Sequence, residues 1–215
     1  MKNSEQSEKT VPKVYLIDDD PIVTFLLVDL AESVNLPYVV FEDALKFLEQ
    51  ACSGLQGCIV SDLRMPGMSG LELQDELHKR NINLPIIFIS AYAEVQSVVR
   101  AMRGGALDFF QKPFSSQDLI ERIQDGLRID KERADLQARN RKTGERIALL
   151  TPREKEVLQG IFEGKLTKVI AEELGISTRT AETYRQLIMQ KLQAGSIAEL
   201  VRIVVDAMPK HPTLS

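Results

Sequence analysis

The most informative part of this sequence is Ile59-Val60-Ser61-Asp62-Leu63-Arg64-Met65-Pro66-Gly67-Met68-Ser69-Gly70. It predicts a short buried strand that ends at the carboxylate of Asp62, followed at once by a loop. Pro66 lacks an amide hydrogen and disfavours the helical region at Met65, so no helix can start before it. In open α/β sheets the reacting groups lie at the carboxyl ends of the strands. Asp62 is therefore either a cap for this turn or a reacting group, depending on its neighbours.

Around this stretch, short apolar runs alternate with helical patterns five times. The predicted strands cover residues 14–17, 38–41, 58–61, 85–90 and 107–110. The first helix is expected to begin with Asp20 as N-cap and Pro21 as its first residue. Alternation with short connections predicts an α/β domain over residues 12–127, a doubly wound five-stranded parallel sheet with helices on both faces.

Residues 128–147 are rich in charge and poor in apolar side chains. This composition predicts a solvated linker helix that extends the fifth helix and breaks at Thr143-Gly144.

Residues 148–208 show helical spacing throughout, which predicts an all-α domain of four helices. Thr151-Pro152-Arg153-Glu154 is a capping box with proline at the first helical position. We expect Thr167 to cap the second helix, Ser177 or Thr178 the third, and Ser196 the last. The turn at Gly175 joins the second and third helices in the manner of a helix-turn-helix.

Composition excludes several classes of protein. The chain has no apolar run long enough to span a membrane, and residues 1–10 are polar, so we expect no secretory signal and no membrane association. Two cysteines and two distant histidines are too few for a disulfide framework or a zinc site. We expect a cytoplasmic protein with reduced cysteines.

Charge varies along the chain. Residues 1–127 contain 11 Lys+Arg and 19 Asp+Glu, net −8, residues 128–150 contain 7 and 4, net +3, and residues 151–215 contain 9 and 8, net +1. The acidic first part favours a metal ion or a basic partner over nucleic acid. The last part is so weakly basic that bulk charge alone does not predict DNA binding.

Polar side chains follow the predicted central strands, whose carboxyl ends should meet at one edge of the sheet. They are Asp18, Asp19, Asp62, Ser90 and Lys112. Three crowded carboxylates repel one another unless a cation joins them, and Mg²⁺ is a hard cation that takes oxygen ligands. A lysine adds a point charge suited to phosphate. Such a site suits phosphoryl transfer to an aspartate.

The same segments resemble a known family. Ile17-Asp18-Asp19-Asp20-Pro21, the stretch from Ser61 to Gly70, Ile89-Ser90-Ala91 and Lys112-Pro113-Phe114 resemble the flavodoxin-like receiver domain of two-component response regulators. Leu150-Thr151-Pro152-Arg153-Glu154, Ile176-Ser177-Thr178-Arg179-Thr180 and Lys191-Leu192 resemble the LuxR-type helix-turn-helix of the NarL/FixJ subgroup. Together the resemblances cover nearly all of residues 12–207. They imply a phosphorylation-dependent transcriptional regulator rather than a metabolic enzyme.

The receiver resemblance implies a role for each polar group. Asp62 would accept a phosphoryl group from a sensor histidine kinase and lose it again by slow self-dephosphorylation. The implied Mg²⁺ ligands are Asp18, Asp19, Asp62 and the backbone carbonyl of Arg64. Ser90 and Lys112 would bind the phosphoryl group. Phe109 stands at the aromatic switch position, with a plain core phenylalanine as the alternative, and Asp20 is expected to be a cap.

The second resemblance implies DNA recognition by the second helix of the helix-turn-helix, which enters the major groove. Its expected inward face is Ala181, Tyr184, Ile188 and Leu192. The implied base contacts are Arg179, Glu182, Thr183 and Gln186. The implied phosphate contacts, which position without specifying, are Lys168, Thr178, Arg185 and Lys191. Each could instead be a solvated surface residue. The implied partners are double-stranded promoter DNA, RNA polymerase and, when phosphorylated, a second copy of the chain.

Two other readings remain open. Asp18-Asp19-Asp20 has the D-x-D spacing of haloacid-dehalogenase-like phosphatases, with Asp18 as nucleophile and Asp20 as acid. That reading leaves Asp62 and residues 151–207 without a role. The third reading is an interaction module whose pocket binds no phosphate. The sequence does not identify the kinase, the promoter or the sign of regulation.

Overall fold

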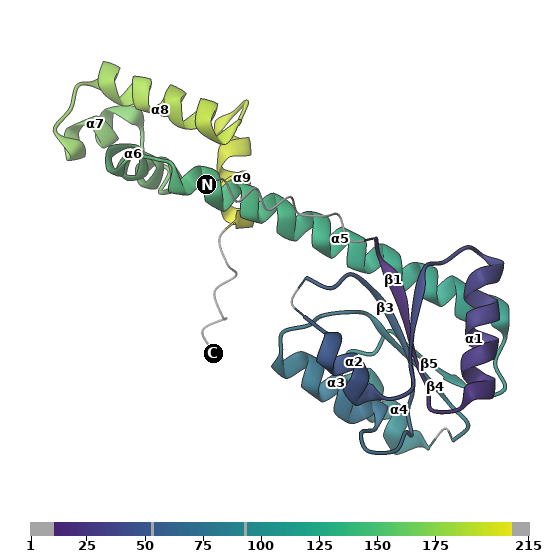
Figure 1. Ribbon diagram of the computed structural model, residues 1–215. Helices are drawn as coiled ribbons and strands as arrows, with labels where there is room; N and C mark the ends of the chain where they lie inside the picture. The colour runs from purple at the N-terminus through teal and green to yellow at the C-terminus, as the bar shows by residue number, and fades with distance from the viewer. Residues whose placement is uncertain (1–10, 53, 93, 208–215) are drawn as a thin grey trace, which may run out of the picture. The chain divides into compact units, whose positions relative to one another are not determined.

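The computed structural model describes residues 11–52, 54–92 and 94–207 (Figure 1). The chain forms two compact units, one ending at Ala134 and the other beginning at Asp135. The polar residues 1–10, and residue 208 at the end of the expected second domain, lie outside the described residues.

The first unit is built on a parallel sheet of five strands in the order β2-β1-β3-β4-β5, which confirms the predicted fold class. The strands are β1 Lys13–Ile17, β2 Tyr38–Phe41, β3 Gly57–Asp62, β4 Ile86–Ser90 and β5 Asp108–Gln111. In register, Ile17 pairs with Ser61 and Asp62 pairs with Ile89. The strand order reverses between β1 and β3, which is where open α/β sheets form a binding crevice.

Helices cover both faces of this sheet. They are α1 Pro21–Ser33, α2 Ala44–Gln50, α3 Gly70–Lys79, α4 Val95–Arg103 and α5 Ser116–Ala148. Successive strand residues point to opposite faces, so Ile59 packs in a core cluster with residues of α2, α3 and α4, whereas Val60 packs with residues of α1 and α5. Both clusters contain residues of the apolar strands that the sequence predicts.

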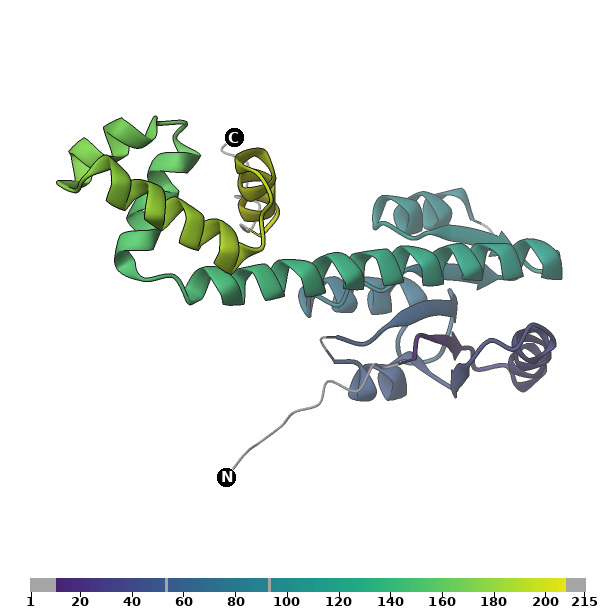
Figure 2. The ribbon, with the colours of Figure 1, turned by 90° about the horizontal axis from the view of Figure 1, so that it is seen from above.

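The long helix α5 corrects two predictions about residues 128–147. It continues through Thr143-Gly144, where we expected a break (Figure 2). Glycine weakens a helix by about 1 kcal/mol relative to alanine, but this cost does not by itself end one. The segment is also not solvated throughout, because Asp130 is only 7% exposed and its carboxylate accepts a hydrogen bond from the Gly57 amide at 2.8 Å.

The second unit contains four further helices, as predicted: α6 Pro152–Phe162, α7 Thr167–Leu174, α8 Thr178–Leu192 and α9 Ile197–Ala207. Its core includes Val157, Ile170, Ile188 and Leu200, each with no more than 1% of its surface exposed. Among the described residues, none of the helices in either unit is both long and apolar enough to cross a lipid bilayer.

Most predicted helix ends of the second unit are confirmed. Thr151 and Glu154 form the capping box, and Gly175 ends α7 with a left-handed φ of 65°. Ser177 caps α8, since its hydroxyl accepts a hydrogen bond from the Thr180 amide. The expected cap Thr167 is wrong: α7 begins at Thr167 itself, and its hydroxyl accepts a hydrogen bond from the Arg185 guanidinium instead.

Candidate functional site

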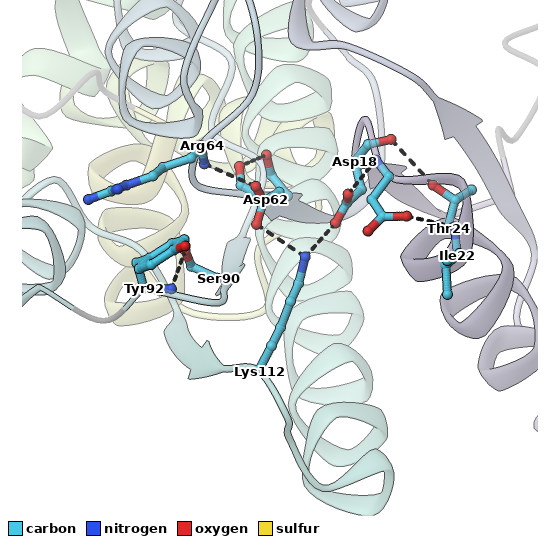
Figure 3. A network of polar contacts seen from close by, with 10 residues as sticks. Asp18, Ile22, Thr24, Asp62, Arg64, Ser90, Tyr92 and Lys112 are labelled. Carbon is cyan, nitrogen blue, oxygen red and sulfur yellow. Dashed lines mark hydrogen bonds and ion pairs between the residues drawn. The ribbon is translucent and has the colours of Figure 1, made fainter.

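The carboxylates of Asp18 and Asp62 lie side by side at the carboxyl edge of the sheet, where β1 and β3 end (Figure 3). Both are buried, with 3% and 8% of their surface exposed. Asp18 Oδ1 accepts a hydrogen bond of 2.9 Å from the Asp20 amide. Asp20 itself caps α1, because its carboxylate accepts a hydrogen bond from the Ile22 amide at 2.8 Å. The prediction of Asp20 as a cap is confirmed.

Lys112 bridges the two carboxylates. Its Nζ lies 2.9 Å from Asp18 Oδ2 and 3.2 Å from Asp62 Oδ1 (Figure 3). Its backbone amide donates to the Ser90 carbonyl at 2.8 Å, which holds the end of β5 against β4. The structure therefore brings together four of the predicted residues, from four different strand ends.

Burial and charge act in opposite directions in this cluster. Burial raises the pKa of Asp18, and the nearby charge of Asp62 adds to the rise, although hydrogen bonds from Lys112 and the Asp20 amide oppose it. Burial alone would lower the pKa of Lys112, but the hydrogen bonds and charges of Asp18 and Asp62 outweigh it and raise that pKa. The ammonium is thus held charged between two carboxylates.

Hydrogen bonds hold the loop after Asp62 to the Asp62 carboxylate and to the neighbouring backbone. The Arg64 amide donates to Asp62 Oδ2 at 3.1 Å. The Leu63 amide donates to the Ile89 carbonyl, and the Gly70 amide donates to the Leu63 carbonyl, at 3.1 and 3.0 Å. A Cβ atom at Gly70 would lie 2.5 Å from the Asp62 carbonyl oxygen, so the close return of the chain requires glycine there.

Ser90 and Arg64 lie on the other side of Asp62 from Asp18 (Figure 3). Ser90 is 1% exposed, and its hydroxyl accepts a hydrogen bond from the Tyr92 amide at 3.2 Å. The Arg64 guanidinium lies over the Tyr92 ring at 5.0 Å and forms an ion pair with Glu94. No local pattern in the sequence marks Tyr92 or Glu94, because their contacts are with a distant residue, 30 positions away in the case of Glu94.

The expected cluster of three carboxylates is not present in this arrangement. Asp19 is exposed, and within the described part of the chain no three His, Cys, Asp or Glu side chains are gathered as a metal-ligand set. Repulsion between Asp18 and Asp62 is instead relieved by Lys112. The donors still fit Mg²⁺ in type and charge, because all of them are oxygen atoms. The two negative charges of Asp18 and Asp62 exceed the one positive charge of Lys112, and Asp19 adds a further negative charge.

An open cleft of about 880 Å³ gives access to Asp18 and Asp19. Its walls are the start of α1, the connection from β2 to α2 and the loop after β3, and they include the apolar side chains Phe25, Leu45 and Pro66. A small molecule can therefore reach Asp18 and Asp19 from this side of the sheet edge.

Phe109, at the predicted switch position on β5, is partly buried and packs against the cluster formed with α2, α3 and α4. The neighbouring Phe110 packs on the opposite face, with its ring centre 6.5 Å from that of Phe114. Phe109 thus lies at the edge of a core.

In the second unit, α8 presents a mixed polar surface. Ala181, Ile188 and Leu192 are fully buried, and Tyr184 is half-buried, so the inward face lies where the sequence predicted it. The exposed candidates for DNA contact are Lys168, Thr178, Arg179, Glu182, Thr183 and Gln186.

Two expected phosphate contacts have partners inside the unit. The Lys191 ammonium lies 2.7 Å from Glu154, whose side chain is 3% exposed, and Arg185 is half-buried and donates to Thr167. Lys191 lowers the pKa of the Glu154 carboxyl, as does the Thr151 amide. The exposed Lys191 and the half-buried Arg185 therefore each have a contact that joins two helices, and their expected contacts with phosphates remain predictions.

Comparison with known proteins agrees with both units. Residues 14–124 match the response regulator receiver domain, and residues 148–204 match the luxR family of bacterial regulatory proteins. The transcriptional regulatory protein TdiR of Thauera aromatica is 40% identical over 89% of this chain and 85% of its own. The transcriptional regulatory protein FixJ of Bradyrhizobium diazoefficiens is 39% identical over 90% of this chain and 95% of its own.

Among solved structures, the response regulator StyR matches with a TM-score of 0.81 and 40% identity over 90% of this chain and 98% of its own. These matches extend over both units and agree with the fold described above. The chain belongs to the response regulators that join a receiver domain to a luxR-family DNA-binding domain.

Proposed function

We propose that Asp62 accepts a phosphoryl group from a sensor histidine kinase and that this controls DNA binding by the second unit. The observation that carries the proposal is the Lys112 ammonium, held between Asp62 and Asp18 at the carboxyl edge of the sheet. An Asp62 oxygen would attack phosphorus in line. The bond from phosphorus to the kinase histidine would break, and its electron pair would stay on the imidazole nitrogen.

The other groups around Asp62 support this chemistry. Lys112 would neutralise charge on the phosphoryl oxygens, and the buried Ser90 hydroxyl would donate to one of them. The amides of Arg64 and Asp20 hold the Asp62 and Asp18 carboxylates in place. The carboxylates of Asp18, Asp19 and Asp62 and the Arg64 carbonyl would hold Mg²⁺, which when bound neutralises charge on the transferred group.

Phe109 would follow Ser90 when that hydroxyl turns toward the phosphoryl group. Its position at the edge of the core, on the strand next to Ser90, is compatible with a rotation of this ring. Slow hydrolysis of the acyl phosphate would return the site to its starting state.

The phosphatase reading is less well supported by the geometry. It needs the Asp20 carboxyl as an acid beside Asp18, but that carboxylate caps α1 through the Ile22 amide. It also leaves unexplained why the Lys112 ammonium contacts Asp62.

Phosphate incorporation from a radiolabelled small acyl phosphate separates these readings. We expect labelling to need Mg²⁺, to vanish in Asp62→Asn and to fall in Asp18→Asn, whereas Asp20→Asn should still be labelled because Asp20 only caps α1. Labelling that survives in Asp62→Asn but vanishes in Asp18→Asn would favour the phosphatase. If nothing is labelled and calorimetry detects no Mg²⁺ binding, the pocket belongs to an interaction module.

For the second unit, we propose that α8 enters the major groove of promoter DNA. Glu182 would accept a hydrogen bond from cytosine N4, and Gln186 would form hydrogen bonds with adenine. Arg179 and Thr183 would contact bases beside them. Lys168 and Thr178 would contact phosphates. Binding-site selection from random DNA tests this: Glu182→Gln should change the preference at one base pair, whereas Lys168→Ala should weaken all sites alike.

Lys191 and Arg185 would also contact phosphates, in addition to joining helices of the second unit. Each is engaged by a partner within the unit, Glu154 and Thr167 respectively. Release of Lys191 toward DNA would leave the Glu154 carboxylate without its cation.

We also propose that phosphorylation pairs two copies through the face formed by α4 and β5. Val95 and Val99 are 77% and 42% exposed there and Arg103 is exposed, whereas Phe110, also expected in this face, is only partly exposed. Residues 151–215 have a net charge of only +1 and therefore neutralise few phosphates. Two half-sites would strengthen binding, and contact with RNA polymerase would follow on the promoter. An unchanged molecular mass in solution on addition of beryllofluoride, with and without DNA, would refute the pairing.

A further inference from the structure

Arg64 connects the loop after Asp62 with the start of α4. Its guanidinium stacks over the Tyr92 ring and forms an ion pair with the Glu94 carboxylate. Glu94 is the residue that precedes α4, yet its side chain makes no capping hydrogen bond to the helix. The negative charge at the start of this helix is therefore directed to Arg64 instead of to the helix amides.

The other attachments of α4 lie in its second half. Ala101 is the only buried residue among those of α4. The Gln74 side chain donates to the carbonyls of Ala101 and Gly104, at 3.2 and 2.9 Å. Arg100 pairs with Asp75 of α3 at 2.7 Å. Among the described residues, Arg64 is thus the side chain that holds the start of α4 to the receiver by polar contact.

The contacts of Arg64 with Tyr92 and Glu94 are weak enough for a phosphoryl group to compete with them. The side chains of Arg64 and Glu94 are 49% and 63% exposed, and exposed ion pairs and cation–π contacts contribute little. A phosphoryl group presents three strong acceptor oxygens, and a guanidinium binds two of them at once through charge-assisted hydrogen bonds. The Arg64 amide lies 3.1 Å from Asp62 Oδ2, so its side chain starts beside the proposed acceptor.

We propose that Arg64 is a positioning residue that couples Asp62 to α4. In the unmodified protein it holds Tyr92 and Glu94, and a phosphoryl group on Asp62 draws it away. The start of α4 is then released from the loop after Asp62. The coupling rests on the proposed phosphorylation of Asp62.

Hydrogen exchange of the full chain, measured by mass spectrometry on peptides covering α4, tests this coupling. Without ligand, Glu94→Gln and Arg64→Ala should each speed exchange in the first turns of α4 about fivefold. Beryllofluoride with Mg²⁺, a mimic of the acyl phosphate, should speed exchange there in the wild type and add nothing further in Glu94→Gln. Both variants change exposed side chains, so the fold should be retained.

Arg100→Ala is the matched control, because it removes another exposed ion pair of the same helix. It should affect only the end of α4 and leave the response to beryllofluoride intact. Unchanged exchange in both test variants, or a full response to beryllofluoride in Glu94→Gln, would overturn the coupling.

Fluorine NMR of bound beryllofluoride separates failure of the coupling from failure of the proposed function. Binding to the wild type without any change in α4 would refute the role of Arg64 while Asp62 remained the acceptor. No binding to the wild type, or equal binding to Asp62→Asn, would refute Asp62 as the acceptor and the coupling with it.

Discussion

Replacement of Lys112 by methionine should destabilise the first unit strongly at neutral pH. The change keeps an unbranched side chain that is one atom shorter, and it removes the cation between Asp18 and Asp62, two carboxylates that are only 3% and 8% exposed. With distances of 2.9 and 3.2 Å and an effective dielectric constant of about 20, each attraction amounts to about 5 kcal/mol.

Most of this attraction is offset in the wild type. The Lys112 side chain is 20% exposed, and removing an ammonium from water costs several kcal/mol. The carboxylates can also regain some water once the lysine is gone. We therefore expect a net loss of about 3 kcal/mol in the free energy of unfolding, at the lower end of the range for breaking a buried ion pair.

The loss should shrink on acidification. Burial already raises the pKa of Asp18 in the folded protein, and without the hydrogen bond and charge of Lys112 that pKa rises further. A group whose folded pKa is raised binds its proton more tightly in the folded state. The charged Asp18 therefore opposes folding at neutral pH, and this penalty disappears as the pH falls through the raised pKa toward the unfolded value of about 3.9.

Hydrogen exchange of peptides from β1 and β3 measures the effect, with peptides from α6 and α8 as an internal reference in the same chain. A loss of about 3 kcal/mol corresponds to exchange about a hundredfold faster at pH 7.5. Lys46→Met is the control, since its ion pair with Glu42 is exposed on both sides and should not contribute measurably. If Lys112→Met behaves like this control, or if its loss does not shrink on acidification, the electrostatic reasoning is wrong.

Substitutions at three further buried residues should also change stability in ways that their contacts predict. Gly70→Ala should cost about 1–3 kcal/mol in urea unfolding and disturb the loop after Asp62, because its Cβ would lie 2.5 Å from the Asp62 carbonyl oxygen. Asp130→Ala should cost about 1–3 kcal/mol by leaving the Gly57 amide without its acceptor. Asp130→Asn should not lower the stability in this way. Burial raises the pKa of Asp130, so the charged form gives no stability at neutral pH, and the asparagine oxygen can still accept the hydrogen bond from the Gly57 amide. The pKa of Glu154 is lowered in the folded protein, so the charged carboxylate stabilises the second unit above pH about 4.3. This stability should be lost as the pH falls through the folded pKa, and it should be absent in Glu154→Ala. Thermal unfolding at pH 7 and pH 3 measures both effects.

Local signals in the sequence were sufficient for most of the fold. Strand positions, the alternation of strand and helix, and the capping box at Thr151 and Glu154 depend on residues within a few positions of one another. Parallel order then brings the ends of β1, β3, β4 and β5 to one edge. That is why Asp18, Asp62, Ser90 and Lys112 could be grouped before their contacts were known.

The incorrect predictions have a common physical cause. Thr143-Gly144 and Thr167 carry ordinary local signals for a helix break and a helix cap. The cost of one glycine is too small to end α5, and the Thr167 hydroxyl bonds to Arg185 instead of capping α7. Helix propensities of about 1 kcal/mol are regularly overridden by tertiary interactions.

The sequence alone was enough to identify the order of the elements, the edge of the sheet where Asp18, Asp62 and Lys112 meet, and the buried face of α8. Side-chain pairing became visible only in three dimensions: Arg64 with Glu94 across 30 residues, Lys191 with Glu154 across 37 and Asp130 with Gly57 across 73. Periodicity specifies which face of an element is buried. It does not specify which charged group of a distant element will lie within 3 Å of another, because that depends on how the packed layers align.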